Sequence, residues 1–345
     1  MNFKLMTAGL AGAAMIFSAG ISLAADVTLR LHQMLPPQAT IPAKAIEPWA
    51  KKVEAESKGR IKIELYPSMQ LGGKPSELVD QVKDGVVDII WTVIGYTPGR
   101  FPRSEVFELP FMGTSATASS MAFQEYYEKH MKNDFPGIHV IAVHMHGPGL
   151  LHMKDKPIEK LEDLKGKKLR GTSRVVNKML ETLGASAIGM PVPQVPESLA
   201  QRVIDGAVIP WEVVPSVKVQ ELVKFHTEIP GSPTFYVATF ILAMNKAKYE
   251  ALAPDLKAII DRNSGAAAAG MAGKVWDEQA IAVSEMVRKR GNTITVIEEA
   301  EAARWRKTTE PVIEAWIKST KEKGLDGEKL LASARAALAK HEKAA

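Results

Sequence analysis

The 345-residue chain contains no cysteine. This absence excludes a thiol nucleophile, a disulfide and any zinc or iron–sulfur site with cysteine ligands. The sequence also lacks the G-x-S-x-G and H-E-x-x-H segments of hydrolases, the G-x-x-x-x-G-K-[ST] phosphate loop and the G-x-G-x-x-G dinucleotide turn. Together these absences remove most familiar classes of enzyme from consideration.

The chain has little net charge for its length. It contains 44 basic and 39 acidic side chains, a formal net charge of +5, and 46% of its residues are hydrophobic. Such a composition is typical of a globular protein and not of a disordered one. Positive charge is concentrated only at 165–170, where no neighbouring aromatic residue could stack on bases. We therefore expect no nucleic-acid partner.

The N-terminus has the pattern of a secretory signal. Lys4 precedes an apolar run, 5–21, which is followed by Ser22-Leu23-Ala24-Ala25. A single positive charge, a short apolar stretch and small residues predict cleavage after Ala24 or Ala25, so 1–24 is the expected signal peptide. The alternative is an uncleaved membrane anchor, but the run is short and Gly-containing, and it lacks a basic stop-transfer cluster.

The next part of the chain alternates strand-like and helix-like patterns. Alternating or continuous apolar residues predict strands, and apolar residues spaced three and four apart predict helices. The expected strands are 27–32, 60–66, 86–91 and 139–145, and the expected helices are 40–57, 75–84 and 115–134. This order predicts an α/β unit in which helices flank a sheet.

A break at His146-Gly147-Pro148-Gly149 separates this unit from a second one. The second unit has expected strands at 167–170, 187–190 and 206–210 and expected helices at 174–183 and 195–204. Beyond it, 233–244 is strand-like, 255–290 has the pattern of one very long helix that would span both units, and two amphipathic helices separated near Gly324 end the chain. The predicted fold class is α/β.

Arg170 is the sharpest candidate for a binding residue. It lies at the end of an expected strand, and Thr172 and Ser173 can cap the helix that follows. A guanidinium at this edge of a sheet is well placed to bind a carboxylate. The alternative is a structural ion pair with an acid such as Glu162 or Asp163.

Aromatic and histidine residues also gather at the expected strand ends. Each of them alone is best explained by core packing, but together they lie where open α/β sheets bind ligands: Trp91, Tyr96, Trp211, Phe235 and Tyr236. His144 and His146 share one face of a strand, but no third metal ligand is evident near them. We expect no metal and interpret these histidines as polar lining or surface residues.

Several motifs resemble the extracytoplasmic solute receptors of tripartite ATP-independent periplasmic (TRAP) transporters, the C4-dicarboxylate-type family. The resemblance runs in the family's order over nearly the whole mature chain, through 66–73, 88–91, 96–102, 108–111, 164–170, 183–185, 190–191 and 204–207. It implies a two-lobed periplasmic binding protein fold, with a sheet flanked by helices in each lobe and a long helix spanning both. The implied boundaries are 25–147 plus 237–275 for lobe I and 148–236 plus 276–345 for lobe II.

The resemblance also implies a function. Such a receptor binds an organic acid in the periplasm and delivers it to membrane permease subunits, without enzymatic activity or a cofactor. The family's carboxylate-binding arginine corresponds to Arg170, and the implied cleft residues are His32, Gln33, Trp91, Trp211, Glu212, Phe235 and Tyr236. We expect a monomer, since no periodic apolar seam is evident.

One departure from the family bears on the ligand. Many relatives that bind sialic acids or dicarboxylates carry a second arginine where this chain reads Gly149-Leu150-Leu151-His152. Its absence, with the aromatic residues, favours a monocarboxylate such as an aromatic or 2-oxo acid. If Glu212 faces the cleft it could accept a hydrogen bond from a substrate hydroxyl or ammonium; otherwise it is a surface carboxylate.

Two other functions remain open at this point. The chain could be the receptor of an ABC-type importer, with the same lobes and an ATP-driven partner. It could also be an exported cofactor-independent enzyme, such as a lyase, that acts on an organic acid.

Overall fold

The computed structural model describes residues 25–344. The expected signal segment, 1–24, lies outside the described residues. Within the described part, no helix has the length and apolar character needed to cross a membrane.

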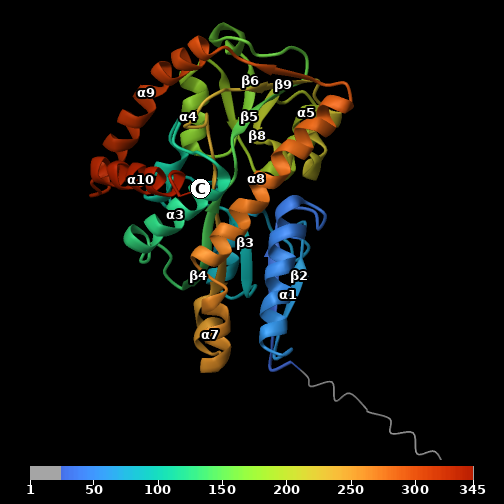
Figure 1. Cartoon of the computed structure of the whole chain (residues 1–345), viewed down its shortest axis with the longest axis vertical. Helices are drawn as coiled ribbons and strands as arrows, with labels where there is room; N and C mark the ends of the chain where they lie inside the picture. The colour runs from blue at the N-terminus through green and yellow to red at the C-terminus, as the bar shows by residue number, and fades with distance from the viewer. Residues whose placement is uncertain (1–24, 345) are drawn as a thin grey trace, which may run out of the picture.

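The chain forms two mixed β-sheets, each flanked by helices (Figure 1). The first sheet has the strand order β2-β1-β3-β10-β4, with β1 parallel to β2 and β3 and with β10 antiparallel to β3 and β4. Its strands are β1 (Val27–Gln33), β2 (Ile61–Tyr66), β3 (Ile89–Val93), β4 (Ile138–Met145) and β10 (Thr239–Asn245). The last strand therefore returns to the first sheet after the chain has built much of the second.

The second sheet has the order β11-β9-β5-β8-β6-β7. Its strands are β5 (Gly149–Met153), β6 (Lys168–Gly171), β7 (Ser186–Gly189), β8 (Gly206–Pro210), β9 (Phe225–Glu228) and β11 (Thr293–Val296). β6 is parallel to β7 and β8, whereas β5 is antiparallel to β8 and β9. The chain crosses from the first sheet to the second between β4 and β5, at the break that the sequence predicts.

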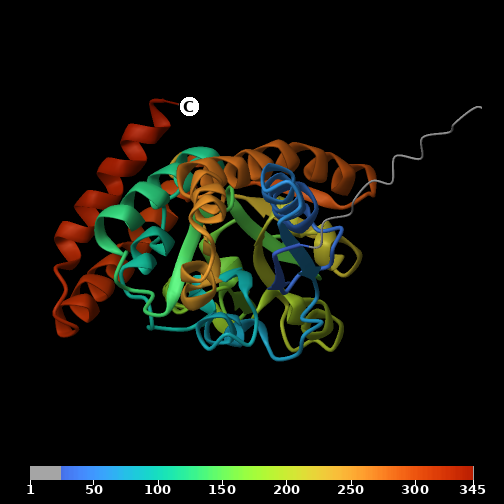
Figure 2. The same ribbon diagram turned by 90° about the horizontal axis from the view of Figure 1, so that it is seen from below.

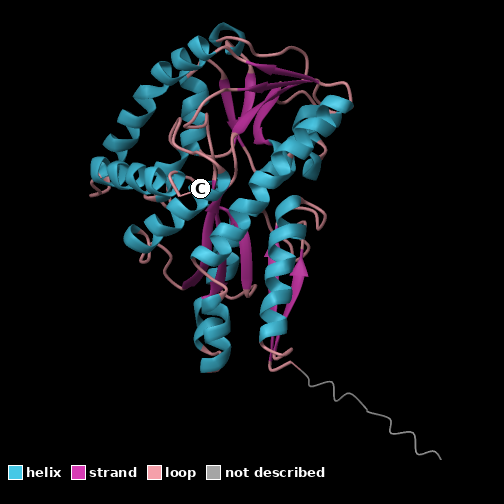
Figure 3. Cartoon of the chain, viewed as in Figure 1, coloured by secondary structure: helices cyan, strands magenta, loops and turns pink. Residues whose placement is uncertain are grey.

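The helices cover the faces of both sheets, as Figure 3 shows by colour. They are α1 (Glu47–Glu56), α2 (Leu78–Lys83), α3 (Ala116–His130), α4 (Arg174–Thr182), α5 (Val195–Ala200), α6 (Lys246–Glu250), α7 (Pro254–Arg262), α8 (Ala266–Lys289), α9 (Glu299–Glu322) and α10 (Gly327–Glu342). Every residue of β3, β8 and β10 is buried. Continuous apolar strands of this kind are typical of sheets with both faces covered.

The expected single helix over 255–290 is wrong. The structure has two helices there, α7 and α8, with a break at 263–265. Gly265 adopts a positive φ of 61°, and its N–H donates to the carbonyl of Ile141 in β4 at 2.7 Å instead of continuing a helix. The shorter helix α8 still runs from the first sheet to the second, as Figure 1 shows, and it contacts both β4 and the turn after β8.

The two C-terminal helices are confirmed, separated near Gly324, and they pack on different parts of the molecule. α9 packs on α4 beside the second sheet, and α10 packs on α3 beside the first. Figure 2 shows α10, in red, alongside α3. The C-terminal segment therefore contacts helices of both sheets.

Candidate ligand-binding site

A cavity lies between the two sheets, at the ends of several strands. The volume open to the centres of water molecules is only about 30 Å³, so the cavity is narrow. Sheet strands, the segments that follow them and α8 contribute its lining: Met34, Leu35, Trp91, Val93, Tyr96, His146, Arg170, Thr172, Val192, Ile209, Pro210, Val213, Tyr236, Ala238, Phe240 and Trp276. Most of these side chains are apolar, so the few polar ones determine which ligand can bind.

Arg170 reaches the cavity from the end of β6 and is only 2% exposed. Its Nε donates to the Met190 carbonyl at 2.9 Å, and its Nη1 donates to the Val208 carbonyl at 3.0 Å and to the Thr172 hydroxyl at 2.9 Å. Its Nη2 makes only a long contact, 3.4 Å, with the Tyr96 hydroxyl. A guanidinium has five N–H groups, so one Nη2 hydrogen has no partner among the described residues.

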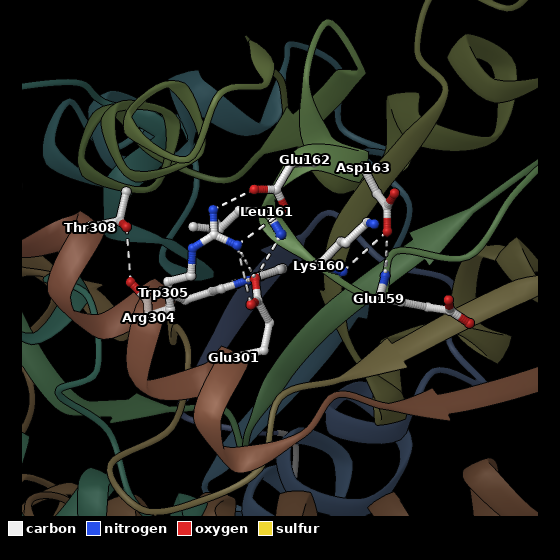
Figure 4. Close-up of polar contacts among 9 residues, drawn as sticks. All are labelled: Glu159, Lys160, Leu161, Glu162, Asp163, Glu301, Arg304, Trp305 and Thr308. Atoms are coloured by element: carbon white, nitrogen blue, oxygen red, sulfur yellow. Dashed lines mark hydrogen bonds and ion pairs between the residues drawn. The ribbon is translucent and has the colours of Figure 1, made fainter.

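The structure separates Arg170 from the two acids that the sequence offered as structural partners. Glu162 pairs with Arg304 of α9, as Figure 4 shows. Asp163 accepts hydrogen bonds from the backbone N–H groups of Glu159 and Lys160 at 3.0 and 3.1 Å. Arg170 is therefore a buried cation whose contacts in the described chain are neutral oxygens, an arrangement suited to an incoming anion.

Two tyrosine hydroxyls complete this polar group. The Tyr96 oxygen accepts from the Val192 N–H at 2.9 Å and from Arg170, which leaves its own O–H free to donate. The buried Tyr236 hydroxyl makes no hydrogen bond of normal geometry with the described residues, although the Thr172 side chain lies beside it. Burial raises the pKa of both phenols, so both keep their protons at neutral pH.

We call Arg170, Thr172, Tyr96 and Tyr236 the polar cluster. Gly149 makes room for it, because a Cβ at this position would lie 2.0 Å from the Tyr236 ring. Gly149 begins the segment 149–152, where many relatives carry a second arginine. In this chain the glycine instead leaves space for the Tyr236 ring. Three donors, the Arg170 Nη2 and two phenolic hydroxyls, are free in the cluster, and a carboxylate can accept from all of them.

The rest of the cavity is walled by aromatic rings. Trp91 and Phe240 stack with their centroids 5.2 Å apart, and Phe240 stacks on His144 at 4.9 Å. Trp276 of α8 packs against Phe240 with a centroid distance of 5.7 Å. We call Trp91, Phe240 and Trp276 the aromatic wall; it provides flat apolar surface for a planar ligand.

His144 and His146 are buried beside this wall, not on the surface. Burial lowers the pKa of His144 to about 3 and that of His146 to about 4, so both rings are neutral at physiological pH. Trp91 Nε1 donates to His144 Nε2 at 2.8 Å, and the Ala238 N–H donates to His146 Nε2 at 3.0 Å. His146 lines the cavity, whereas His144 supports the wall from behind. No group of three or more potential metal-ligating side chains occurs in the described part of the chain.

Arg170, Trp91 and Tyr236 are the predicted binding residues that line the cavity. His32 and Gln33, at the end of β1, do not. His32 Nδ1 lies 2.8 Å from the Gln81 amide oxygen, and its Nε2 accepts from the Leu71 N–H. Gln33 bonds both the N–H and the carbonyl of Leu35. The next residues, Met34 and Leu35, take their place in the lining, so this strand end supports the site from outside it.

Trp211, Glu212 and Phe235 also lie outside the cavity lining. Trp211 donates to Glu228 at 2.7 Å and packs on His152, with a centroid distance of 5.5 Å. Phe235 packs edge-on to Trp305 at 5.5 Å. Their chain neighbours Pro210, Val213 and Tyr236 contact the cavity instead.

Glu212 is buried, and it is not among the residues that line the cavity. It is only 1% exposed, and its Oε2 has no partner among the described residues. Burial, with a smaller contribution from Asp277, raises its pKa to about 8, so it is largely protonated at neutral pH. Its side chain lies near Gly147, in the crossing between the sheets.

Sequence reasoning missed Thr172, Phe240 and Trp276 as lining residues, and it placed Tyr96 only within the group of aromatic residues at the strand ends. Tyr96 follows the end of β3, and this position just beyond a strand end is the sequence feature that could have identified it as a lining residue. Phe240 and Trp276 come from segments far along the chain, and only the pairing of β10 with β3 brings Phe240 opposite Val93.

Comparisons with known proteins agree with this architecture. The family model described as "Bacterial extracellular solute-binding protein, family 7" matches residues 32–319. A TRAP solute-binding protein from Rhodoferax ferrireducens T118, solved with copurified benzoate, is 50% identical, with a TM-score of 0.90 and coverage of 92% of this chain and 99% of that one.

Two further similar proteins extend the comparison. A marine metagenome TRAP solute-binding protein specific for aromatic acid ligands, solved with 3-hydroxybenzoate, is 48% identical, with a TM-score of 0.90 and coverage of 92% of this chain and 99% of that one. The outer membrane transporter protein TsaT of Comamonas testosteroni is 29% identical over 337 residues, which cover 96% of this chain and 97% of TsaT.

Proposed function

The chain belongs to family 7 of the bacterial extracellular solute-binding proteins, the family of TRAP solute receptors, and we propose that its own ligand is a single-ring aromatic monocarboxylate. One observation carries the proposal. The buried Arg170 has no acidic partner in the described chain, and its free Nη2 hydrogen lies in a cavity with two phenolic donors and an aromatic wall. The proteins solved with benzoate and 3-hydroxybenzoate bind ligands of the same chemistry.

The free donors of the polar cluster determine how a single carboxylate would bind. Nε and both Nη1 hydrogens of Arg170 are used by the protein, so the carboxylate would accept from Nη2 and from the Tyr96 and Tyr236 hydroxyls. Hydrogen bonds to charged groups contribute about 1.5–3 kcal/mol each, so two or three of them with one buried ring approach the −8 kcal/mol of a micromolar complex.

The aromatic ring of the ligand would lie on the aromatic wall. The cavity is small and its walls contain no second free cation among the described residues. A dicarboxylate would therefore bury one carboxylate without a partner, which is costly. A flat ring would instead cover Trp91 and Phe240 with apolar surface.

Contacts between the lobes support a closed form of the receptor. Arg174 of α4 binds Glu105 from the segment after β3, and the Thr40 hydroxyl donates to the Glu212 carbonyl at 3.1 Å. Opening the lobes to admit a ligand would break such contacts, and closure on the ligand would restore them and exclude water. We further propose that the mature receptor, cleaved after Ala24 or Ala25, is a periplasmic monomer that hands its ligand to TRAP permease subunits.

The test is calorimetry and thermal unfolding with benzoate, benzamide and succinate. Benzoate should stabilise the protein, by about 2.7 kcal/mol at a concentration 100 times its Kd. Benzamide has the same shape without the charge and should not, and succinate should not because of its second carboxylate. Stabilisation by succinate but not by benzoate would contradict the proposal.

A receptor should also return its ligand unchanged. Benzoate incubated with the purified protein and then analysed by mass spectrometry should be recovered intact. A product would favour the exported enzyme that the sequence left open.

A further inference from the structure

The aromatic wall has two indole N–H groups, and both are directed at His144, outside the cavity lining. The indole N–H of Trp91 donates to His144 Nε2 at 2.8 Å, and the indole N–H of Trp276 points at the other nitrogen of the same ring at 3.4 Å. A neutral imidazole has one lone pair to accept a hydrogen bond, and the shorter contact assigns it to Trp91. Both indole N–H groups are directed at His144, which does not line the cavity.

The groups beside the wall are engaged as well. His146 Nδ1 lies 2.6 Å from the Gly147 carbonyl, so it donates there, and its Nε2 accepts from the Ala238 N–H at 3.0 Å. The Leu35 N–H donates to the Gln33 amide oxygen. Both ring nitrogens of His146 and these two backbone donors are therefore occupied.

The other lining side chains outside the polar cluster have no hydrogen-bonding atom, apart from the weakly accepting sulfur of Met34. They are aliphatic or are the ring of Phe240. A hydroxyl carried by the ligand into this part of the cavity would lose its water and find no side-chain partner, which weakens binding.

Taking the receptor as the aromatic-acid receptor proposed above, we infer that it selects a ring without a hydroxyl at the positions remote from the carboxylate. His144 is the positioning residue for this selectivity, because it accepts the Trp91 N–H that a ring hydroxyl could otherwise use. Benzoate and 3-hydroxybenzoate, each found in a similar protein, thus differ in fit to this chain, and the unsubstituted ring is the better one.

The test compares benzoate with its 3-methyl, 4-methyl, 3-hydroxy and 4-hydroxy derivatives by calorimetry on the wild-type protein. Methyl and hydroxyl groups are similar in size, so each pair separates polarity from volume. We expect each hydroxy acid to bind about 10- to 100-fold more weakly than the matching methyl acid. If the hydroxy acid binds as tightly as the matching methyl acid at both the 3-position and the 4-position, the inference is wrong.

A pair of variants tests the same point from the protein side. Val93→Thr places a hydroxyl in the lining at nearly constant volume, and Val143→Thr makes the same change at a buried residue of β4 that does not line the cavity. The ratio of the affinity for the methyl acid to that for the hydroxy acid should fall by about 3-fold or more in Val93→Thr. The reason is that the new threonine hydroxyl can form about one neutral hydrogen bond with the ligand hydroxyl. It should stay at the wild-type value in Val143→Thr, and equal ratios in the two variants would overturn the inference.

Failure of the two proposals can be told apart. If benzoate binds and the hydroxy acids bind equally well, the selectivity is wrong and the proposed function stands. If none of the five acids binds, the proposed function itself is contradicted.

Discussion

Arg170 and Trp91 line the same cavity and both carry N–H groups, but the protein treats these groups differently. Arg170 keeps an Nη2 hydrogen free although the side chain is buried. Trp91 gives its only N–H to His144. A buried donor without a partner destabilises a folded protein, so the free donors of the polar cluster are a cost that a bound anion would relieve. The indole N–H groups of the aromatic wall are directed at His144, so the wall offers no side-chain donor to a polar ligand group.

The difference between the polar cluster and the aromatic wall also explains how one small cavity could select a ligand by both charge and shape. The polar cluster comes from the end of β6 and from the segments after β3 and before β10, while the aromatic wall comes mainly from β3, β10 and α8. Both lobes contribute, so neither lobe alone contains the complete site. A substitution in the polar cluster should therefore leave the contacts of the aromatic wall unchanged, and the reverse should also hold.

The largest expected effect comes from removing the charge. Arg170→Met should weaken benzoate binding by at least about 100-fold, because the carboxylate would be buried without a cation. Calorimetry measures this loss, and the circular dichroism of the ligand-free variant checks its fold.

The matched control is Arg304→Met, which removes an arginine from the exposed ion pair with Glu162 shown in Figure 4. Exposed pairs contribute little, so its affinity for benzoate should stay within about 2-fold of the wild type. A folded Arg170→Met protein that binds benzoate normally would remove Arg170 from the site.

A smaller effect is expected for the hydroxyl without a partner. Tyr236→Phe should weaken benzoate binding by about 10-fold, the scale of one hydrogen bond to a charged group. The ligand-free variant should be at least as stable as the wild type, because the deleted hydroxyl makes no hydrogen bond of normal geometry with the described residues. Urea unfolding and calorimetry measure the two quantities, and lower stability with unchanged affinity would show that the hydroxyl serves the fold and not the ligand.

A separate prediction concerns the pH dependence of stability, and it tests whether the histidines beside the aromatic wall are uncharged. Burial holds the pKa of His144 near 3 and that of His146 near 4, below the value of about 6.5 in the unfolded chain. Between roughly pH 4 and 6.5 the unfolded chain therefore binds protons that the native protein does not, and stability rises with pH by up to about 1.4 kcal/mol per pH unit for each group. His226, with a pKa near 4, acts in the same direction.

Two buried carboxyls act in the opposite direction. Burial raises the pKa of Glu108 to about 7 and that of Glu212 to about 8. From about pH 4.5 up to these values the native protein holds protons that the unfolded chain has lost, so these groups make stability fall as pH rises. The histidines outnumber them below pH 6.5, so urea unfolding should show a stability maximum near pH 6.5. Glu212→Gln should flatten the decline above it, and an unchanged decline would show that Glu212 is ionised in the native protein.

Much of the fold could be predicted from local pattern. Continuous apolar strands and regularly spaced helical positions are set by neighbouring residues, and the strands at 27–32, 139–145 and 206–210 match β1, β4 and β8 closely. The break between α7 and α8 was missed, although Asn263-Ser264-Gly265 interrupts the apolar pattern with residues typical of a helix end. The contact that accompanies the break, from the Gly265 N–H to the Ile141 carbonyl, joins residues far apart in the chain. The strands β5, β9 and β11 were missed; β9 pairs with both β5 and β11, so these strands depend on residues far apart in the chain.

The site divides in the same way. The position of Arg170 at the cavity could be predicted because the strand end, Gly171 and the helix cap at Ser173 are all local. Gln33 has an equally good local position, but its side chain turns back onto the backbone of Leu35. Trp211 is likewise drawn away by Glu228 of a distant strand. Sequence pattern can place a residue at the edge of a sheet, but tertiary hydrogen bonds decide where its side chain points.

A crystal structure of the protein with benzoate tests this binding mode most directly. We expect the carboxylate to accept hydrogen bonds from Arg170 Nη2 and from the hydroxyls of Tyr96 and Tyr236, with the ring against Trp91 and Phe240. A carboxylate bound elsewhere, or a ring held away from the aromatic wall, would contradict it.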